Sequence, residues 1–363
     1  NIKKQSISVL LLLFTFGINP LKAQNHAHNQ TAPLDFDSII QADAFSLNHA
    51  EKFGALIIQD AGGRMKPANT FSSELLRKVS KSDTYKGLNS DQVLLSIMNN
   101  PAVWYNVPMV YLKRGNDSLR RLTGTGPKAK YAALLSFFDA EGNYKIAPQL
   151  EEAYLASVPN QFQKDFIEVD KRVNLLYSAL EGKIMRIFPI PDDPNNKWVS
   201  YPELSEANFK GKDSLYVRNI LPLYFQSLRL AQQDKDYAQA ENLLESIHGF
   251  QKKFGNQVLP SEDKVKAEML YNKYDIFKKL FSWYLYAGTL FFLLLIIQIF
   301  KSNKLISYCV SGFKVLMLLL FLLHTGGLAA RWFISGHAPW SDAYESMIYV
   351  AWATQFFGLV FGR

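Results

Sequence analysis

The sequence contains very little cysteine: its 363 residues include one, Cys309, and that residue lies inside an apolar run. A single cysteine excludes a disulfide bond within the chain. It also excludes a Cys-x-x-Cys redox site and a zinc site built from cysteines. Any thiol chemistry in which this protein takes part must therefore come from a partner.

The common catalytic motifs are missing as well. The sequence has no glycine-rich phosphate loop, no serine elbow and no His-Glu metal motif. His49 is an isolated histidine that could be a haem or metal ligand, or a polar residue at the end of a helix; without a companion ligand the second interpretation is favoured. The sequence therefore predicts no catalytic residue and no metal site.

The net charge is +8, which by itself would be compatible with a nucleic-acid partner. No nucleic-acid-binding motif accompanies the basic residues, so we expect no nucleic acid among the partners. The basic residues suit anionic lipid or a ligand that carries propionate groups.

Hydropathy divides the chain into three parts. Residues 1–23 carry Lys3 and Lys4, then an apolar run over residues 7–18 that is too short to span a bilayer comfortably. They predict a signal peptide or an N-terminal anchor, and both would place residues 24–280 outside the cytoplasm as a soluble domain. Residues 281–363 are mostly apolar and predict membrane helices.

The soluble region is expected to be α-rich with a few strands. Thr70 is expected to cap a helix, and the prolines of residues 188–194 predict an irregular segment. The expected strands cover residues 55–59, 64–67 and 107–112, and the expected helices cover residues 166–180, 213–232 and 236–254.

Three membrane helices are predicted at residues 283–300, 305–330 and 347–359, after an amphipathic segment at 264–279. The Lys301–Lys304 connection is basic, so it should face the cytoplasm. The polar connection at residues 331–346 then lies outside, on the side of the soluble region. The fold class is thus mainly α: an extracytoplasmic α-rich (α+β) domain followed by the first helices of a polytopic membrane bundle. The third helix is short and has no polar tail behind it, so we expect the sequence to be the N-terminal part of a longer protein.

The connection at residues 331–346 is unusually rich in polar and aromatic residues, which are costly at a membrane face and often functional. Ser341 or Asp342 can cap the third helix, and the aromatic rings can lie at headgroup depth or stack on a flat porphyrin. Arg331 can pair with Glu345, a lipid phosphate or a haem propionate. A rigid cap that only holds two helices in register would explain most of these residue types equally well. The candidate recognition residues are Arg331, Trp332, His337, Pro339, Trp340, Asp342, Tyr344 and Glu345.

His324 lies in the second predicted span, where a histidine should face the helix bundle or a cavity. Haem ligation and a hydrogen bond to another helix are both open for it.

The sequence that starts at Arg331 resembles the early transmembrane hairpin of the CcsA/ResC-type cytochrome c assembly proteins. The shared pattern is Arg-Trp-x-x-Ser-Gly-His-x-Pro-x-Ser-Asp-x-Tyr-Glu-Ser, followed by Trp352. A second segment starts at Gly63 and reads Gly-Arg-Met-Lys-Pro-Ala-Asn-Thr. It resembles part of the long fused assembly proteins of Bacteroidetes-like bacteria, and this resemblance implies no particular chemistry. The resemblance covers about the last eighty residues at best.

The resemblance implies a multi-pass protein of the bacterial cytoplasmic membrane with a large periplasmic domain. The complete protein would act as a holocytochrome c synthase that presents haem b to the Cys-x-x-Cys-His thiols of apocytochrome c. It implies a ResB-like partner, fused or separate, and a thiol-reducing protein. The family's tryptophan-rich haem segment has no counterpart in this sequence, so no axial ligand is carried over. The alternative is a membrane-anchored extracytoplasmic adaptor or sensor without haem chemistry.

Overall fold

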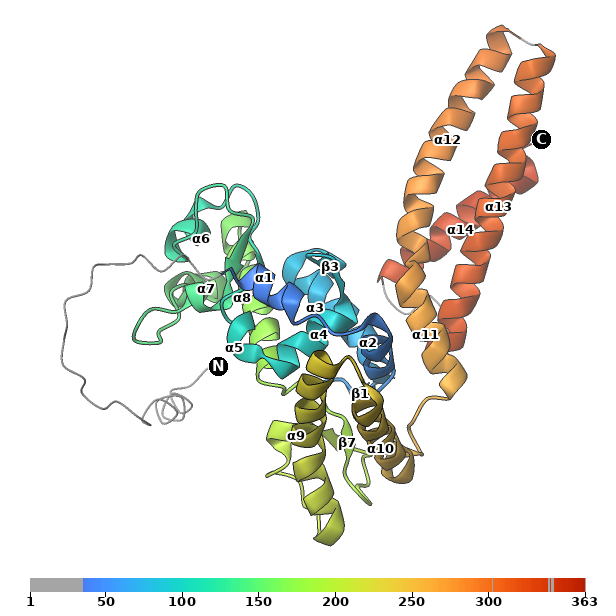
Figure 1. The fold of residues 1–363 in the computed structure, drawn as a ribbon. Helices are drawn as coiled ribbons and strands as arrows, with labels where there is room; N and C mark the ends of the chain where they lie inside the picture. The colour runs from blue at the N-terminus through green and yellow to red at the C-terminus, as the bar shows by residue number, and fades with distance from the viewer. Residues whose placement is uncertain (1–34, 302, 339, 341–342, 363) are drawn as a thin grey trace. The chain divides into compact units, whose positions relative to one another are not determined.

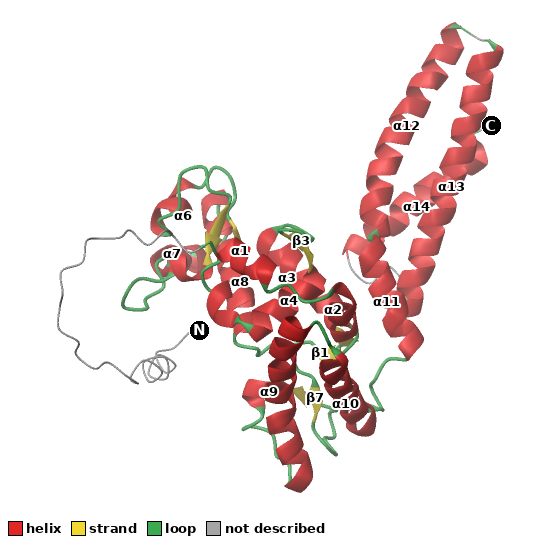
Figure 2. Ribbon diagram, viewed as in Figure 1, coloured by secondary structure: helices red, strands yellow, loops and turns green. Residues whose placement is uncertain are grey.

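The computed structural model describes residues 35–301, 303–338, 340 and 343–362 (Figure 1). The predicted signal peptide or anchor at residues 1–23 lies outside this range. Helices dominate and the strands are short, as Figure 2 shows, so the predicted mainly α class is confirmed. The chain divides into two compact units: residues up to 45 with 75–183, and residues 46–74 with 184 onward.

The first unit is built around α8 (Gln161–Leu180), which packs against α7 (Ala147–Leu155), α4 (Ser90–Asn99) and β5 (Pro108–Tyr111). Asn160 and Gln163 cap α8 reciprocally, which explains why the helix starts five residues before the apolar residue Phe166. Trp104, Phe137 and Phe166 are fully buried between these elements. The remaining elements are α1 (Phe36–Ala42), β3 (Thr84–Tyr85), β4 (Leu88–Asn89), α5 (Pro101–Trp104), α6 (Asp117–Leu122), β6 (Tyr131–Ala133) and a 3-10 turn at Leu134–Phe137, with the C-terminal part of α3 (Ala68–Ser80).

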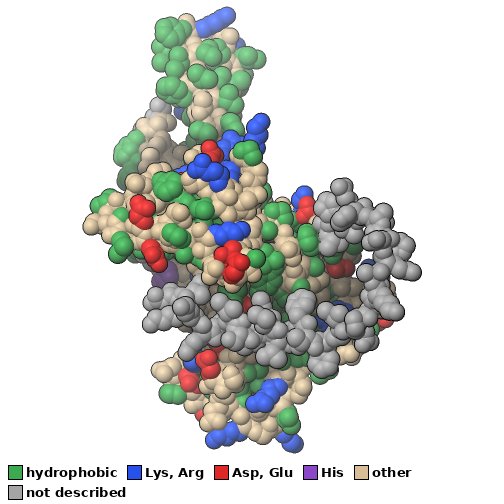
Figure 3. Space-filling model, turned by 90° about the vertical axis from the view of Figure 1, so that its left-hand side faces the viewer, with side chains coloured by type: hydrophobic (Ala, Val, Ile, Leu, Met, Phe, Trp, Pro, Cys, Tyr) green, Lys and Arg blue, Asp and Glu red, His purple; other side chains and the backbone are tan. Residues whose placement is uncertain are grey.

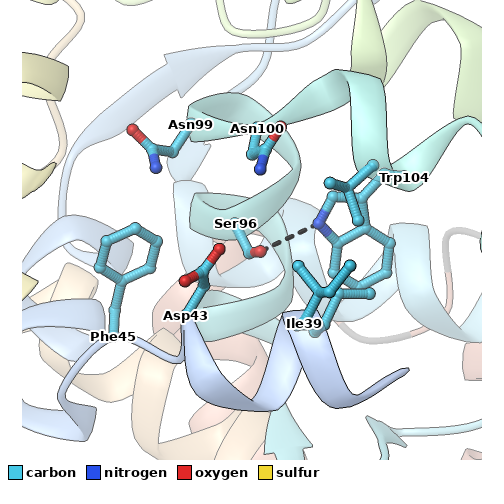
Figure 4. Close-up of a pocket in the computed structure, with 9 residues that line it drawn as sticks. Ile39, Asp43, Phe45, Ser96, Asn99, Asn100 and Trp104 are labelled. Carbon is cyan, nitrogen blue, oxygen red and sulfur yellow. Dashed lines mark hydrogen bonds between the residues drawn. The ribbon is translucent and has the colours of Figure 1, made fainter. Parts of the chain in front are cut away.

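A small pocket in this unit lies between α1 and α4 (Figure 4). Trp104 Nε1 donates a hydrogen bond of 2.9 Å to Ser96 Oγ at its wall. The pocket has about 10 Å³ of room, which is the space of roughly one water molecule. It is therefore too small for a porphyrin or a peptide.

In the second unit, α9 (Gly211–Asp234) and α10 (Ala238–Gly255) pack side by side and against α2 (Leu47–Gly54) and β7 (Phe188–Pro189). Gln251 of α10 is fully buried; its amide donates to the carbonyls of Ile57 at 2.8 Å and Ile187 at 3.0 Å. It thereby joins the strand pair β1 (Ile57–Gln59) and β2 (Met65–Pro67) to β7 and β8 (Trp198–Val199). The strands are antiparallel within each pair, with Ile57 opposite Pro67 and Phe188 opposite Val199.

Two local features of this unit follow directly from residue type. Pro222 lies inside α9 and has no N–H to bond the carbonyl of Arg218 four residues earlier; the Tyr201 hydroxyl donates to that carbonyl instead, at 3.2 Å. Gly255 ends α10 against the Trp198 ring, where an added Cβ would lie 2.5 Å from a ring carbon. Trp198 is 1% exposed, so it serves packing.

Two expectations about residues 24–280 need correction. Thr70 does not cap a helix, because α3 begins at Ala68 and Thr70 lies within its first turn. Residues 188–189 form a short strand, because Phe188 pairs with Val199 despite the neighbouring prolines. His49 lies in the first turn of α2, near the helix end as favoured from the sequence; it is fully buried there, and its Nε2 lies 2.9 Å from the Tyr224 hydroxyl.

The C-terminal helices are α11 (Glu262–Tyr274), α12 (Ile276–Phe300), α13 (Lys304–Ser335) and α14 (Ala343–Phe361). Within the described residues, two stretches are long and apolar enough to cross a membrane: Glu262–Phe300, in which α11 and α12 follow each other, and Lys304–Ser335. Helices α12 and α13 form a hairpin. In Figure 3, hydrophobic side chains cover the part of this hairpin that is nearest its turn, and basic side chains lie at the turn itself. Lys301 and Lys304 flank that turn and are exposed. Helix α14 covers the third predicted span, whose passage through a membrane stays a prediction.

Candidate functional site

The candidate site lies where α13 ends and α14 begins. Helix α13 runs to Ser335 and stops at Gly336, whose φ of +74° and N–H bond of 2.9 Å to the Trp332 carbonyl close the helix. Arg331 and Trp332 are therefore on the last helical turn rather than in a loop. The observed connection between α13 and α14 is shorter than the predicted residues 331–346, because α13 ends at Ser335 and α14 starts at Ala343.

Tyr344 and Glu345 lie in the first turn of α14, where the carboxylate is favoured by the helix N-terminus. Pro339 and Asp342, together with Ser341, lie outside the described residues. The predicted cap by Ser341 or Asp342 thus stays a prediction.

Arg331 and Glu345 form the ion pair that joins the two helices. Arg331 Nε lies 3.2 Å from Glu345 Oε1, and Nη2 bonds the same oxygen. The Glu345 residue is only 3% exposed. A carboxylate removed from water in this way needs a hydrogen-bonded cation, and Arg331 supplies it.

The same guanidinium reaches a third helix through Tyr271 of α11. Arg331 Nη1 donates to the Tyr271 hydroxyl at 3.3 Å, and the guanidinium carbon lies 5.8 Å from the Tyr271 ring and 5.6 Å from the Tyr344 ring. These are cation–π distances. Arg331 therefore fixes α11, α13 and α14 relative to one another at one end of the hairpin.

Around this buried pair, aromatic side chains face outward. Trp332 and Trp340 are each 60% exposed and Tyr344 is 53% exposed. His337 is exposed too, next to Ser335, whose hydroxyl donates to the His337 carbonyl at 2.9 Å. The Trp340 ring meets Tyr349 of α14 edge to face, with 5.6 Å between centroids. The site thus combines a fixed cation with several exposed aromatic faces.

His324 lies on α13 and is 3% exposed. Its ring packs against Phe277 at 5.4 Å and Tyr284 at 5.9 Å on α12. Neither ring nitrogen makes a hydrogen bond of good geometry to the described residues, and neither does the buried Tyr284 hydroxyl. The Ile348 backbone of α14 is nevertheless a hydrogen-bond partner for the imidazole, so haem ligation and a hydrogen bond to another helix both stay predictions for His324.

Two contacts near the site had no specific signal in the sequence. Thr325 Oγ1 accepts a hydrogen bond of 2.9 Å from Trp352 Nε1, which ties α13 to α14. Tyr271 belongs to the predicted amphipathic segment at residues 264–279, and its aromatic character was the sole available clue. Within the described residues, no group of three His, Cys, Asp or Glu side chains is arranged to hold a metal ion.

Several known proteins are similar in sequence to this chain. No protein-family model matches the chain. Protein NrfI of Wolinella succinogenes is 33% identical over all of this chain and 39% of its own length. The cytochrome c biogenesis protein CcsA of Lotus japonicus is 43% identical over 58 residues, and that of Glycine max is 46% identical over 44 residues. The chain is therefore similar to the CcsA/ResC-type cytochrome c assembly proteins, in line with the resemblance found in the sequence.

The chain spans about two fifths of the length of NrfI. The matched segments are 16% and 12% of this chain and 18% and 14% of the two CcsA proteins.

Proposed function

We propose that the protein acts in cytochrome c biogenesis as a membrane component that receives haem b and presents it for covalent attachment to apocytochrome c. The observation that carries the proposal is the Arg331–Glu345 pair, bonded to Tyr271, which fixes exposed aromatic side chains at one end of the helical hairpin. The similarity to CcsA proteins supports it.

In this proposal the site binds haem as a substrate. The faces of Trp332, Trp340 and Tyr344 stack on the porphyrin, for which flat, exposed rings are suited. A guanidinium has five N–H donors, so Arg331 can bind a propionate oxygen while it holds Glu345. His337, Pro339 and Asp342 complete the recognition segment between the two helices. His324 is proposed as an intramembrane ligand or hydrogen-bond site.

The chemistry itself belongs to haem and the apocytochrome. Each Cys thiol of the Cys-x-x-Cys-His segment adds across a haem vinyl group: sulfur bonds to one vinyl carbon and the hydrogen ends on the other, with no net oxidation. The two apocytochrome thiols must be reduced beforehand. A dithiol reductant needs two cysteines, and Cys309 is a single one. A thiol-reducing protein and a ResB-like partner, fused or separate, are therefore part of the proposal. This protein contributes binding and orientation, and the whole protein would act as a holocytochrome c synthase.

The proposed place of action is the bacterial cytoplasmic membrane, with the soluble region outside. The exposed lysines at the α12–α13 turn support a cytoplasmic turn. Glu268 and Tyr271 of α11 contact Arg64 and Arg331, so the segment around Arg64 and the candidate site lie at the same end of the hairpin.

The proposal is tested by removing exposed tryptophans from the full-length protein. We expect Trp332→Ala and Trp340→Ala each to lower the yield of a reporter holocytochrome by about two- to tenfold, the effect of one lost stacking contact. Covalent haem staining, normalised to the amount of this protein in the membrane, measures the yield.

The matched control is Trp283→Ala, because Trp283 lies on α12 outside the site and is also partly exposed, at 43%. It should leave the yield unchanged. Equal yields from all three variants and the wild type would show that Trp332 and Trp340 serve only as membrane-interface residues, and the proposal would fail.

A further inference from the structure

The segment from Gly63 to Thr70, Gly-Arg-Met-Lys-Pro-Ala-Asn-Thr, has no part in the proposed haem chemistry, yet its polar side chains converge on α11. We propose that residues 63–70 form a clamp that sets the position of α11 and, through Tyr271, the position of the Arg331–Glu345 end of the hairpin. Arg64, Asn69 and Thr70 would then be positioning residues for the haem-presenting site. This inference rests on the proposed function.

The first contact of the clamp is to Glu268 of α11. Arg64 Nη2 lies 2.9 Å from Glu268 Oε1, and the Thr70 hydroxyl donates to the same oxygen at 2.8 Å. Glu268 is 8% exposed. A carboxylate buried to this degree is strongly destabilising without such partners, so these contacts hold α11 against the segment.

The second contact lies one turn further along α11, at Asn272. The Asn272 amide donates to Asn69 Oδ1 at 3.0 Å and to Thr70 Oγ1 at 2.9 Å. Thr70 thus bonds both Glu268 and Asn272, which are four residues apart and lie on one face of the helix. Contacts on two successive turns fix the rotation of α11 as well as its position.

The clamp is itself held together by Lys66. This lysine is 5% exposed, and its ammonium lies 3.6 Å from Asp60 and 3.1 Å from Glu74. Asp60 follows β1 and Glu74 belongs to α3, so Lys66 joins the β1–β2 hairpin to the helix that carries Thr70. Arg64 and Thr70 therefore reach α11 from one braced piece of structure.

Helix α11 needs such a support because α12 does not continue it. Asp275 separates the two helices and adopts a left-handed conformation, with a φ of 42°. The direction of α11 is therefore not set by a continuous helix. Tyr271 lies between the clamped residues Glu268 and Asn272, so the same turn that receives the clamp also receives Arg331.

The test uses the full-length protein with a spin label at Met347→Cys in a Cys309→Ser background. Met347 is 74% exposed and lies two residues after Glu345, so the label reports on the start of α14. Thr70→Val removes the hydroxyl that bonds Glu268 and Asn272 and keeps the side-chain volume. Thr70→Ser keeps the hydroxyl.

We expect Thr70→Val and Glu268→Ala to increase the mobility of the label and to lower the normalised holocytochrome yield by up to about a hundredfold, the loss that misplacement of a site by about an ångström can cause. Thr70→Ser should behave as the wild type. Glu262→Ala is the matched control on α11, because it removes an exposed ion pair of 2.8 Å with Lys252. It should change neither readout.

Thr70→Val and Glu268→Ala variants with an unchanged label spectrum would overturn the inference, and so would equal effects of Thr70→Ser and Thr70→Val. The label does not depend on haem, so the two proposals fail separately. A mobile label in a protein whose yield does not respond to Trp340→Ala would support the clamp and contradict the proposed function.

Discussion

Glu345 is a carboxylate that is almost completely removed from solvent, at the start of a helix whose sequence is otherwise largely apolar. Arg331 bonds it, and Tyr271 bonds Arg331. Breaking a buried ion pair by removing one partner leaves the other charge uncompensated, whereas replacing both partners by apolar residues is far less destabilising. The pair should therefore behave as a unit.

We expect Glu345→Ala to lower the free energy of unfolding by about 3–5 kcal/mol and the double variant Glu345→Ala with Arg331→Met to lower it by less. Thermal unfolding of the detergent-solubilised protein measures both. A double variant less stable than the single one would mean that Arg331 stabilises the structure mainly through Tyr271 and Tyr344.

His49 is a second buried ionisable residue, in the soluble region. Its ring stacks on Tyr237 at 4.9 Å, Nε2 lies 2.9 Å from the Tyr224 hydroxyl, and Glu241 Oε1 lies 4.0 Å from Nδ1. Burial lowers the pKa of His49 to about 4; the charge of Glu241 opposes this shift and that of Lys52 adds to it. The native state therefore keeps His49 neutral at a pH where the unfolded chain has already bound a proton.

The sign of the pH effect follows from this difference. Above pH 6.5 neither state binds the proton, so His49 imposes no penalty; as pH falls from about 6.5 to about 4, proton uptake by the unfolded chain destabilises the native state by up to about 3 kcal/mol. We expect His49→Gln to remove that part of the pH dependence. Urea unfolding at pH 4.5 and pH 7.5, followed by tryptophan fluorescence, measures it, and the same loss of stability in wild type and variant would contradict the assignment to His49.

Among the helices, the close approach of α12 and α13 depends on one glycine. A Cβ added to Gly327 would lie 2.9 Å from Phe277 Cζ and 3.2 Å from Ile276 Cγ2, whereas one added to Gly326 meets nothing within 4 Å. Phe277 is 7% exposed and cannot move aside freely. Adjacent glycines on one helix thus have different surroundings.

Gly327→Ala should lower the free energy of unfolding by about 1–3 kcal/mol, because overpacking displaces Phe277 and the His324 ring beside it. Gly326→Ala is the control and should be neutral or slightly stabilising, since alanine is the better helix former. Resistance of the solubilised protein to thermal unfolding measures both. Equal effects of the two substitutions would show that α12 and α13 are not packed at this point.

The elements that follow periodic apolar patterns could be predicted to within a few residues, as α9 and α10 show. Short elements could not: β7 depends on pairing with β8 across a turn, and two residues leave no pattern. The Arg331–Glu345 pair was foreseeable because opposite charges fall at the two ends of a short connection. Tyr271 was not, since it is 60 residues from Arg331 and only the packing of α11 brings them together. The contact of Arg64 with Glu268, 204 residues apart, was hidden for the same reason.

At the scale of the whole molecule, the arrangement makes the orientation in the membrane testable. Residues 25–280 and the end of α13 should lie on the extracytoplasmic side, and the α12–α13 turn on the cytoplasmic side. A reporter fused after Gly336 should behave as exported and one fused after Asn303 as cytoplasmic. The opposite pattern would overturn the orientation that Lys301 and Lys304 indicate.

The separation of Arg64 from Glu268 along the chain also imposes an order on the maturation of the protein. Chains are made from the N-terminus, so the clamp segment leaves the ribosome some 200 residues before α11. The proposed clamp can close only after the residues between Arg64 and Glu268 have been made. The position of the Arg331–Glu345 pair would then depend on chain synthesised about 260 residues before it.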